Sequence, residues 1–139
     1  MVYFFYMEII LSGEFGRVFF AVGTILVTWI VWNGYYKNQF SARFAWGTTI
    51  LFIIYASAFL LFNYLTGEVD EHANTERWYA LIASIHGTIA LAAIIHACIA
   101  FYKAKDAFAR GENYFRDHKK MSISLVLLWP LSLLSGLFL

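Results

Sequence analysis

Two histidines, His86 and His96, lie within one long apolar run of the sequence and are the residues best suited to chemistry. An ionisable side chain in hydrocarbon is rare and is usually kept there by a partner, a ligand or a cofactor. An imidazole can ligate haem or a metal ion, or it can hydrogen-bond to another helix. On a helix the two backbones lie roughly 15 Å apart along the axis and the rings about 80° apart around it. The two histidines therefore do not form one bidentate site.

The composition indicates that the elements carrying these histidines lie in a membrane. The chain is 61% hydrophobic and only 14% charged, with a formal net charge of +1. A helix needs about 20 apolar residues to cross a bilayer, and four uncharged stretches come close to or exceed that length. The sequence therefore predicts an all-α fold, an integral membrane four-helix bundle that forms a single membrane domain over residues 1–139. The predicted segments are an interfacial stretch at 1–12 and helices at about 18–36, 44–65, 78–102 and 121–139.

Lysine and arginine are distributed unevenly between the two sides of the predicted bundle. The loops at 37–43 and 103–120 share one side and hold eight of these residues, whereas the other side holds only Arg17 and Arg77. Basic loops face the cytoplasm. We therefore expect both termini on the outer side of a multi-pass protein, in a bacterial or archaeal cytoplasmic membrane.

The remaining histidines limit how a cofactor could be ligated. His72 falls in the predicted outer acidic loop, and His118 comes just before the last predicted helix. A bis-histidine haem within this chain needs two facing helices that offer one histidine each, and only one predicted helix contains histidines. A haem here therefore requires a loop histidine, a different ligand such as Met121, or another subunit. The candidate cofactor-binding residues are His86, His96 and His118, and haem is the candidate cofactor. By depth His96 and His118 are the better pair, and the sequence leaves open whether a metal ion is bound.

Small residues share the helix face around His86, which leaves a second interpretation open. Such residues let another helix, or a flat macrocycle, approach the backbone closely. In the second interpretation His86 is hydrogen-bonded across helices in ordinary helix packing, and His96 has a structural role near the inner interface. The small residues are Ala83, Gly87, Ala90, Ala93 and Ala97.

Other kinds of activity have no support in the sequence. It contains no nucleophile–base arrangement, no phosphate-binding glycine loop and no cysteine-ligand spacing. No predicted helix contains Asp, Glu, Lys or Arg that could couple transport. We therefore expect no catalytic residues and no enzyme activity of the chain itself, although it could be a subunit of an oxidoreductase complex. Nothing indicates nucleic acid, and the expected partners are membrane lipid and other subunits of a respiratory membrane complex.

The second half of the chain, mainly residues 84–139, resembles the CtaM/YozB-like four-helix membrane family. That family carries a histidine early in its third helix, a Tyr–basic pair closing that helix, and a His–basic–basic sequence before a fourth helix with Trp and a Ser/Thr–Gly pair. The matching positions are His86, Tyr102–Lys103, His118–Lys119–Lys120, Trp129 and Ser135–Gly136. The family's histidine near the end of helix two is replaced here, at about Asn63, and the histidine of its first cytoplasmic loop is absent.

The resemblance implies association with haem-copper terminal oxidases, in particular their maturation or activity. The resulting prediction is a non-catalytic accessory subunit or assembly factor of a respiratory electron-transfer complex. It would be linked to cytochrome oxidase and could bind haem or metal through the membrane histidines. Two alternatives stay open: a membrane anchor of a quinone-linked redox complex that ligates haem b or chlorophyll, and a purely structural subunit.

Overall fold

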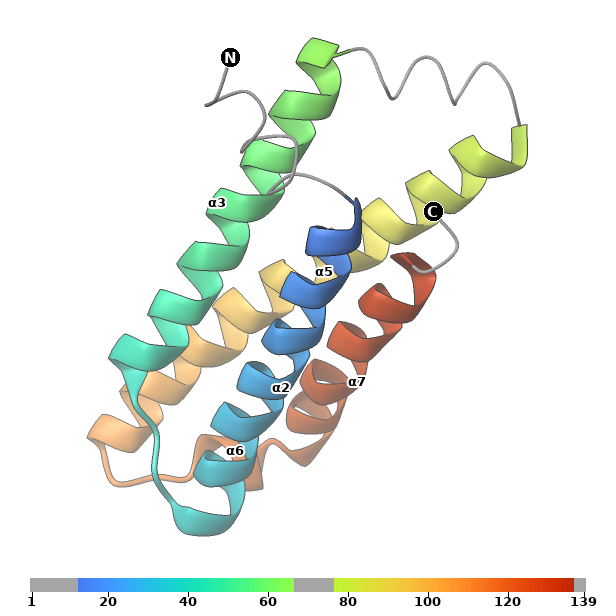
Figure 1. The fold of residues 1–139 in the computed structure, drawn as a ribbon. Coiled ribbons are helices and arrows are strands. Elements are labelled where there is room, and N and C mark those ends of the chain that lie inside the picture. Colours follow the sequence, from blue (N-terminus) through green and yellow to red (C-terminus); the bar gives the residue numbers. More distant parts are fainter. Residues whose placement is uncertain (1–12, 67–76, 137–139) are drawn as a thin grey trace.

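A computed structural model of the chain describes residues 13–66 and 77–136, and these residues form helices and short connections without any strand. The long helices run in alternating directions through the molecule (Figure 1). The all-helical prediction is therefore confirmed. The predicted interfacial segment at 1–12, and His72 in the outer loop, lie outside the described residues. The helices are α2 (Gly13–Lys37), α3 (Ala42–Thr66), α5 (Arg77–Ala109), α6 (Tyr114–Asp117) and α7 (Lys119–Gly136).

Three of the described helices are long and apolar enough to cross a membrane. They provide the segments Phe15–Lys37, Ala42–Phe62 and Leu81–Ala109. Large apolar side chains such as Ile25, Leu60 and Leu91 are more than half exposed on their outer faces. Outward-facing aliphatic side chains on long helices are what a lipid environment accepts. The chain is therefore a membrane protein by the length and composition of its helices. The last long helix, α7, has 18 residues and begins with two lysines.

The third long helix continues about two turns beyond its predicted end at residue 102. α5 ends at Ala109, so Lys103 and Lys105 lie on a helix and not in a loop. The extension keeps one apolar stripe, because Ala104 and Ala107 are buried while the charged side chains between them are exposed. A helix with one buried stripe and a charged outer face is stable at the end of a bundle. The predicted loop at 103–120 thus shrinks to a short turn and α6.

α6 fastens the end of the bundle to the C-terminus of α2. The side chain of Asn113 caps α6 by accepting from the amide of Arg116, and its own nitrogen donates to the carbonyl of Gly34 at 2.8 Å. The guanidinium of Arg116 donates to the carbonyl of Tyr35 at 3.0 Å. The last carbonyls of a helix have no partner within the helix. α6 therefore satisfies two groups that would otherwise face solvent.

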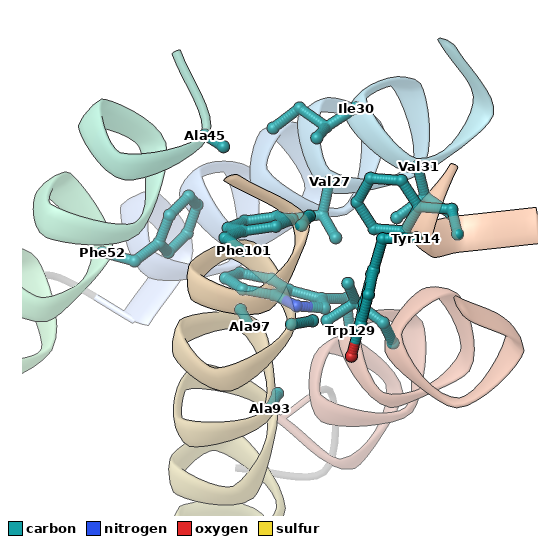
Figure 2. Packing of buried hydrophobic residues seen from close by; sticks show 14 of the residues in the cluster. Val27, Ile30, Val31, Ala45, Phe52, Ala93, Ala97, Phe101, Tyr114 and Trp129 are labelled. Carbon is teal, nitrogen blue, oxygen red and sulfur yellow. The ribbon is translucent and has the colours of Figure 1, made fainter. Parts of the chain in front are cut away.

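A single large cluster of buried side chains lies where the long helices meet. Trp129 of α7 is its largest member at 1% exposure, and it lies beside Phe101 and Ala97 of α5 (Figure 2). Its ring also contacts Phe52 of α3 edge to face, with centroids 4.8 Å apart. Trp129 therefore links α7 to two other helices at the centre of the molecule.

Candidate functional site

His86 faces α7 and forms a polar contact across the helix interface. Its Nδ1 lies 3.0 Å from Oγ of Ser135, a residue 49 positions later in the chain. Gly136 follows, and a Cβ atom built there would lie 2.9 Å from Cε1 of His86. Only glycine thus leaves room for the ring at this point. The ring of Phe20 of α2 also lies beside the imidazole, edge to face, with the two ring centroids 6.3 Å apart.

His96 makes the corresponding contact about three helical turns further along the same interface. Its Nε2 lies 2.8 Å from Oγ of Ser124 and 3.3 Å from the carbonyl oxygen of Met121. Moving ten residues along α5 from His86 to His96 corresponds to moving eleven residues back along α7 from Ser135 to Ser124. Both pairs therefore belong to one antiparallel register of α5 against α7.

The hydrogen-bond network assigns a tautomer to each of these two histidines. Oγ of Ser135 donates its hydrogen to the carbonyl of Ser132 at 2.8 Å, so Nδ1 of neutral His86 must be the donor to Ser135. Oγ of Ser124 likewise donates to the carbonyl of Met121 at 3.0 Å, so Nε2 of His96 must be the donor to Ser124. His86 therefore keeps a lone pair on Nε2, and His96 keeps one on Nδ1.

The tautomers make His86 the better candidate ligand of the two. A metal-ligating histidine commonly donates its other ring N–H to a nearby acceptor, which fixes the ring and directs the free nitrogen. His86 satisfies that condition through Ser135. His96 uses its outermost nitrogen, Nε2, within the interface. The arrangement can thus offer one nitrogen of His86 to a haem or metal, and a second ligand has to come from elsewhere.

Small residues bring α5 and α7 close enough for these contacts. Ala93 lies between the two histidines on α5, and Ala97 and Ala100 follow His96; all three are buried, each at no more than 2% exposure. Trp129 and Leu125 of α7 are buried against the same cluster. Without a hydrophobic effect between helices in lipid, close packing and interhelical hydrogen bonds supply the association energy. At Ala93 and Ala97 the small-residue face expected from the sequence is therefore a helix-packing face, whereas Gly87 of the same set is exposed.

His118 lies away from both of the other candidates, at the junction of α6 and α7. Its ring stacks on Tyr114 with centroids 4.4 Å apart, and its Nδ1 donates to the carbonyl of Tyr114 at 3.1 Å. Burial raises the pKa of the Tyr114 phenol above its ordinary value. Seventeen residues along α6 and α7 separate His118 from Ser135, the partner of His86. At the rise of a helix this is about 25 Å, so His86 and His118 cannot ligate one haem within this chain.

Depth favoured His96 and His118 as a pair, but each directs a ring nitrogen to a different group of the chain. His96 directs Nε2 to Ser124, and His118 directs Nδ1 to the backbone of its own turn. Among the described residues no group of three or more His, Cys, Asp or Glu side chains could hold a metal ion. Each candidate histidine thus hydrogen-bonds a partner within the chain, and none of the hydrogen bonds among the described residues joins two of them.

Sequence reasoning missed the serine partners and three buried polar groups. The hydroxyls of Tyr55 and Ser132 and the indole nitrogen of Trp129 are buried without a hydrogen-bond partner. The signal for the serines was present in the spacing, because Ser124 and Ser135 lie on α7 at an interval that matches the interval of the histidines. The pairing also needs the relative direction and depth of two helices, which neither segment contains alone.

The chain was compared with known proteins at three levels. No protein-family model, no curated protein and no solved structure matches it.

Proposed function

We propose that the chain is a non-catalytic membrane accessory subunit or assembly factor of a respiratory electron-transfer complex, linked to a haem-copper oxidase. All four long helices, α7 included, cross the bilayer in this proposal. Both termini lie on the outer side, and the basic ends of α2, α5 and α7 face the cytoplasm. This arrangement follows the excess of lysine and arginine at that end.

One observation supports this proposal most directly. Positions that carry the resemblance to the CtaM/YozB-like family lie together in space, although 49 residues separate them in the chain. His86 hydrogen-bonds Ser135, and the missing side chain of Gly136 makes room for the imidazole. Trp129, another matching position, is buried two turns away on the same face of α7. A contact that depends on three of the matching residues gives them a shared physical role.

The proposal is tested by purifying the tagged chain from its native membranes in mild detergent and identifying what accompanies it. We expect oxidase subunits, recognised by mass spectrometry and by a haem A absorption band. His86→Ala should reduce this association. His96→Ala is the matched control, because His96 is not one of the positions that carry the family resemblance, and it should reduce the association less. A wild-type preparation that carries no oxidase subunit under conditions in which the oxidase itself stays assembled would contradict the proposal.

A second candidate is a membrane anchor that ligates haem b or chlorophyll together with a partner chain. The observation favouring it is the tautomer of His86, whose Nε2 is left with a lone pair while Nδ1 is fixed by Ser135. A bound haem would supply one-electron transfer, and the role of this chain would be to orient one axial nitrogen. A Soret band that persists in the purified complex and is lost in His86→Ala supports this candidate, and a colourless complex rules it out.

A third candidate is a purely structural subunit, in which both histidines only join α5 to α7. The two His–Ser pairs favour it. Unchanged assembly of the complex after the combined substitution of His86→Ala and His96→Ala would select it over the other two.

A further inference from the structure

A cavity of about 500 Å³ lies at the end of the bundle where α2 turns into α3. One wall is aromatic and includes Trp29, Phe40 and Phe44, while the turn itself contributes the polar side chains of Asn38, Gln39 and Ser41. Asn38 has φ of 54°, a conformation that asparagine tolerates, and this reversal lets the amide of Gln39 reach the carbonyl of Asn33 at 3.1 Å. The turn is thus fixed by its own backbone hydrogen bond.

An apolar groove of about 360 Å³ continues from this cavity along the outer face of α2. Trp29 lines both spaces, and the groove passes Ile25 and Thr28 toward the middle of the helix. From Thr24 to Asn38 the two spaces together cover about 21 Å along the axis of α2. The cavity is thus a partly polar chamber at the end of a membrane helix, and the groove beside it is apolar. Together they match the shape of a lipid headgroup followed by an acyl chain.

The charges around the chamber favour an anionic headgroup. Lys37 precedes Asn38, and Arg43 lies between Ser41 and Phe44. Ser41 caps α3 by accepting from the amide of Phe44 at 3.3 Å, which leaves its hydroxyl hydrogen free to donate to a ligand. The positive end of the 25-residue helix α3 begins at Ala42, beside the chamber. No charged residue lines the chamber itself, so the positive charge comes from the residues beside it.

The same end of the molecule is basic as a whole. Among the described residues there it carries eight Lys and Arg side chains against Asp106, Glu112 and Asp117. Juxtamembrane basic residues attract the anionic lipids of the cytoplasmic leaflet. In the orientation proposed above, on which this step rests, the chamber lies at the depth and on the side where such headgroups are most concentrated.

We infer that this chamber binds the headgroup of one anionic phospholipid, whose acyl chain lies in the groove along α2. The lipid phosphate takes hydrogen bonds from the turn and the start of α3, with Lys37 and Arg43 as its counter-charges. The aromatic wall packs on the glycerol and the upper chain. This site concerns the membrane location of the protein and is independent of any link to an oxidase.

The test is native mass spectrometry of the full chain, delipidated in detergent and titrated with phosphatidylglycerol or phosphatidylcholine of identical acyl chains. We expect one phosphatidylglycerol to bind in preference to phosphatidylcholine. The double variant Lys37→Gln with Arg43→Gln should weaken phosphatidylglycerol binding by about 25-fold, which corresponds to about fivefold for each cationic side chain. The matched control, Lys119→Gln with Lys120→Gln, removes the same charge from the same end and should change binding by less than twofold.

Two further measurements keep the inference open to refutation if a charge variant folds poorly. Gln39→Phe fills the chamber without changing its charge and should also remove the preference for phosphatidylglycerol, with helix content checked by circular dichroism. Lipids with brominated chains should quench tryptophan fluorescence, and Trp29→Phe should remove the part of the quenching that depends on the headgroup.

Three outcomes would overturn the inference. Equal weakening in the two double variants would reduce the effect to general surface charge. Absence of a headgroup preference in the wild type would remove the reason for a specific site. Displacement of the phosphatidylglycerol by an equal concentration of a neutral quinone would assign the chamber to a different class of ligand.

Discussion

The interface between α5 and α7 and the interface between α2 and α3 hold their helices together in different ways. Apart from Phe101, the buried residues of α5 are alanines, and two histidines of the same helix each pair with a serine of α7. Between α2 and α3 the contact consists of large rings, with Phe19 lying 4.5 Å from Phe52 and 4.3 Å from Tyr55. The first interface depends on close backbones and directed bonds, and the second on interlocking side chains.

The difference shows two solutions to the same physical problem. In lipid the surrounding chains are as apolar as the helices, so helix association depends on packing density and interhelical hydrogen bonds. Rings give many dispersion contacts without requiring close backbones. Small residues permit close backbones, which bring short polar side chains such as serine within reach of a histidine. Only the interface built from small residues places a ring nitrogen in a defined orientation, so the candidate site lies between α5 and α7.

Replacing Trp129 should have the largest effect, because its ring contacts both interfaces. Trp129→Ala leaves a large void beside Phe52 of α3 and Phe20 of α2. We expect a loss of about 3–5 kcal/mol in the free energy of unfolding, measured in mixed micelles by denaturant titration. Trp32→Ala is the control, because Trp32 is 54% exposed. A loss no greater than that of the control would show that Trp129 does not join the two interfaces.

Gly23→Ala should break the aromatic interface selectively. A Cβ at Gly23 would lie 2.0 Å from Cζ of Phe52, so the ring or the helix has to move. We expect a loss of about 1–3 kcal/mol on unfolding. Gly47→Ala is the matched control, since no atom lies within 4 Å of its added Cβ, and the higher helix propensity of alanine should leave stability equal or slightly higher. Equal losses in both variants would attribute the effect to something other than the Phe52 contact.

The hydrogen bond of the other interface should contribute less. A double-mutant cycle of His86→Ala and Ser135→Ala should give a coupling of about 0.6 kcal/mol, and no more than about 1.7 kcal/mol. The cycle of His96→Ala and Ser124→Ala supplies the comparison within the same interface, because its contact of 2.8 Å is similarly short. Additive single losses at either pair would remove the His–Ser bond as a source of interface stability.

The smallest effect should come from the exposed end of the molecule, outside both interfaces. Arg110 hydrogen-bonds Glu112 at 2.8 Å and thereby holds the pKa of that carboxyl below its ordinary value. The bond stabilises the folded state above the unfolded pKa of glutamate, and this contribution disappears as the pH falls through the lowered folded pKa. Both side chains are exposed, so Glu112→Gln should leave the unfolding midpoint at pH 7 unchanged within error. A clear drop in that midpoint would indicate that the turn after α5 matters more than its exposure suggests.

Much of the fold could be predicted from the sequence, because the uncharged stretches set the helices directly. The stretch predicted at 44–65 is observed as Ala42–Thr66, within two residues at each end. The third helix was underestimated, because the lysines after Tyr102 were taken to end it. Ala104 and Ala107 continue the buried stripe of α5, and Lys103 and Lys105 are exposed without breaking the helix.

Of the candidate site, only the histidines could be predicted from the sequence. That His86 needs a partner followed from its place in an apolar run, and that partner is Ser135. Which serine it meets depends on the antiparallel register of α5 and α7, which also pairs His96 with Ser124. The separation of His86 from His118 depends on the same register, because it places the two histidines at opposite ends of α7.

The sequence by itself determined that the chain is helical and apolar enough for a membrane, and that imidazoles lie inside it. These properties depend on composition within single segments. The tertiary structure decided which ring nitrogen of each histidine keeps a lone pair. That choice depends on whether the facing serine has already given its hydrogen to its own helix. A tautomer is a property of two packed helices, and neither helix specifies it alone.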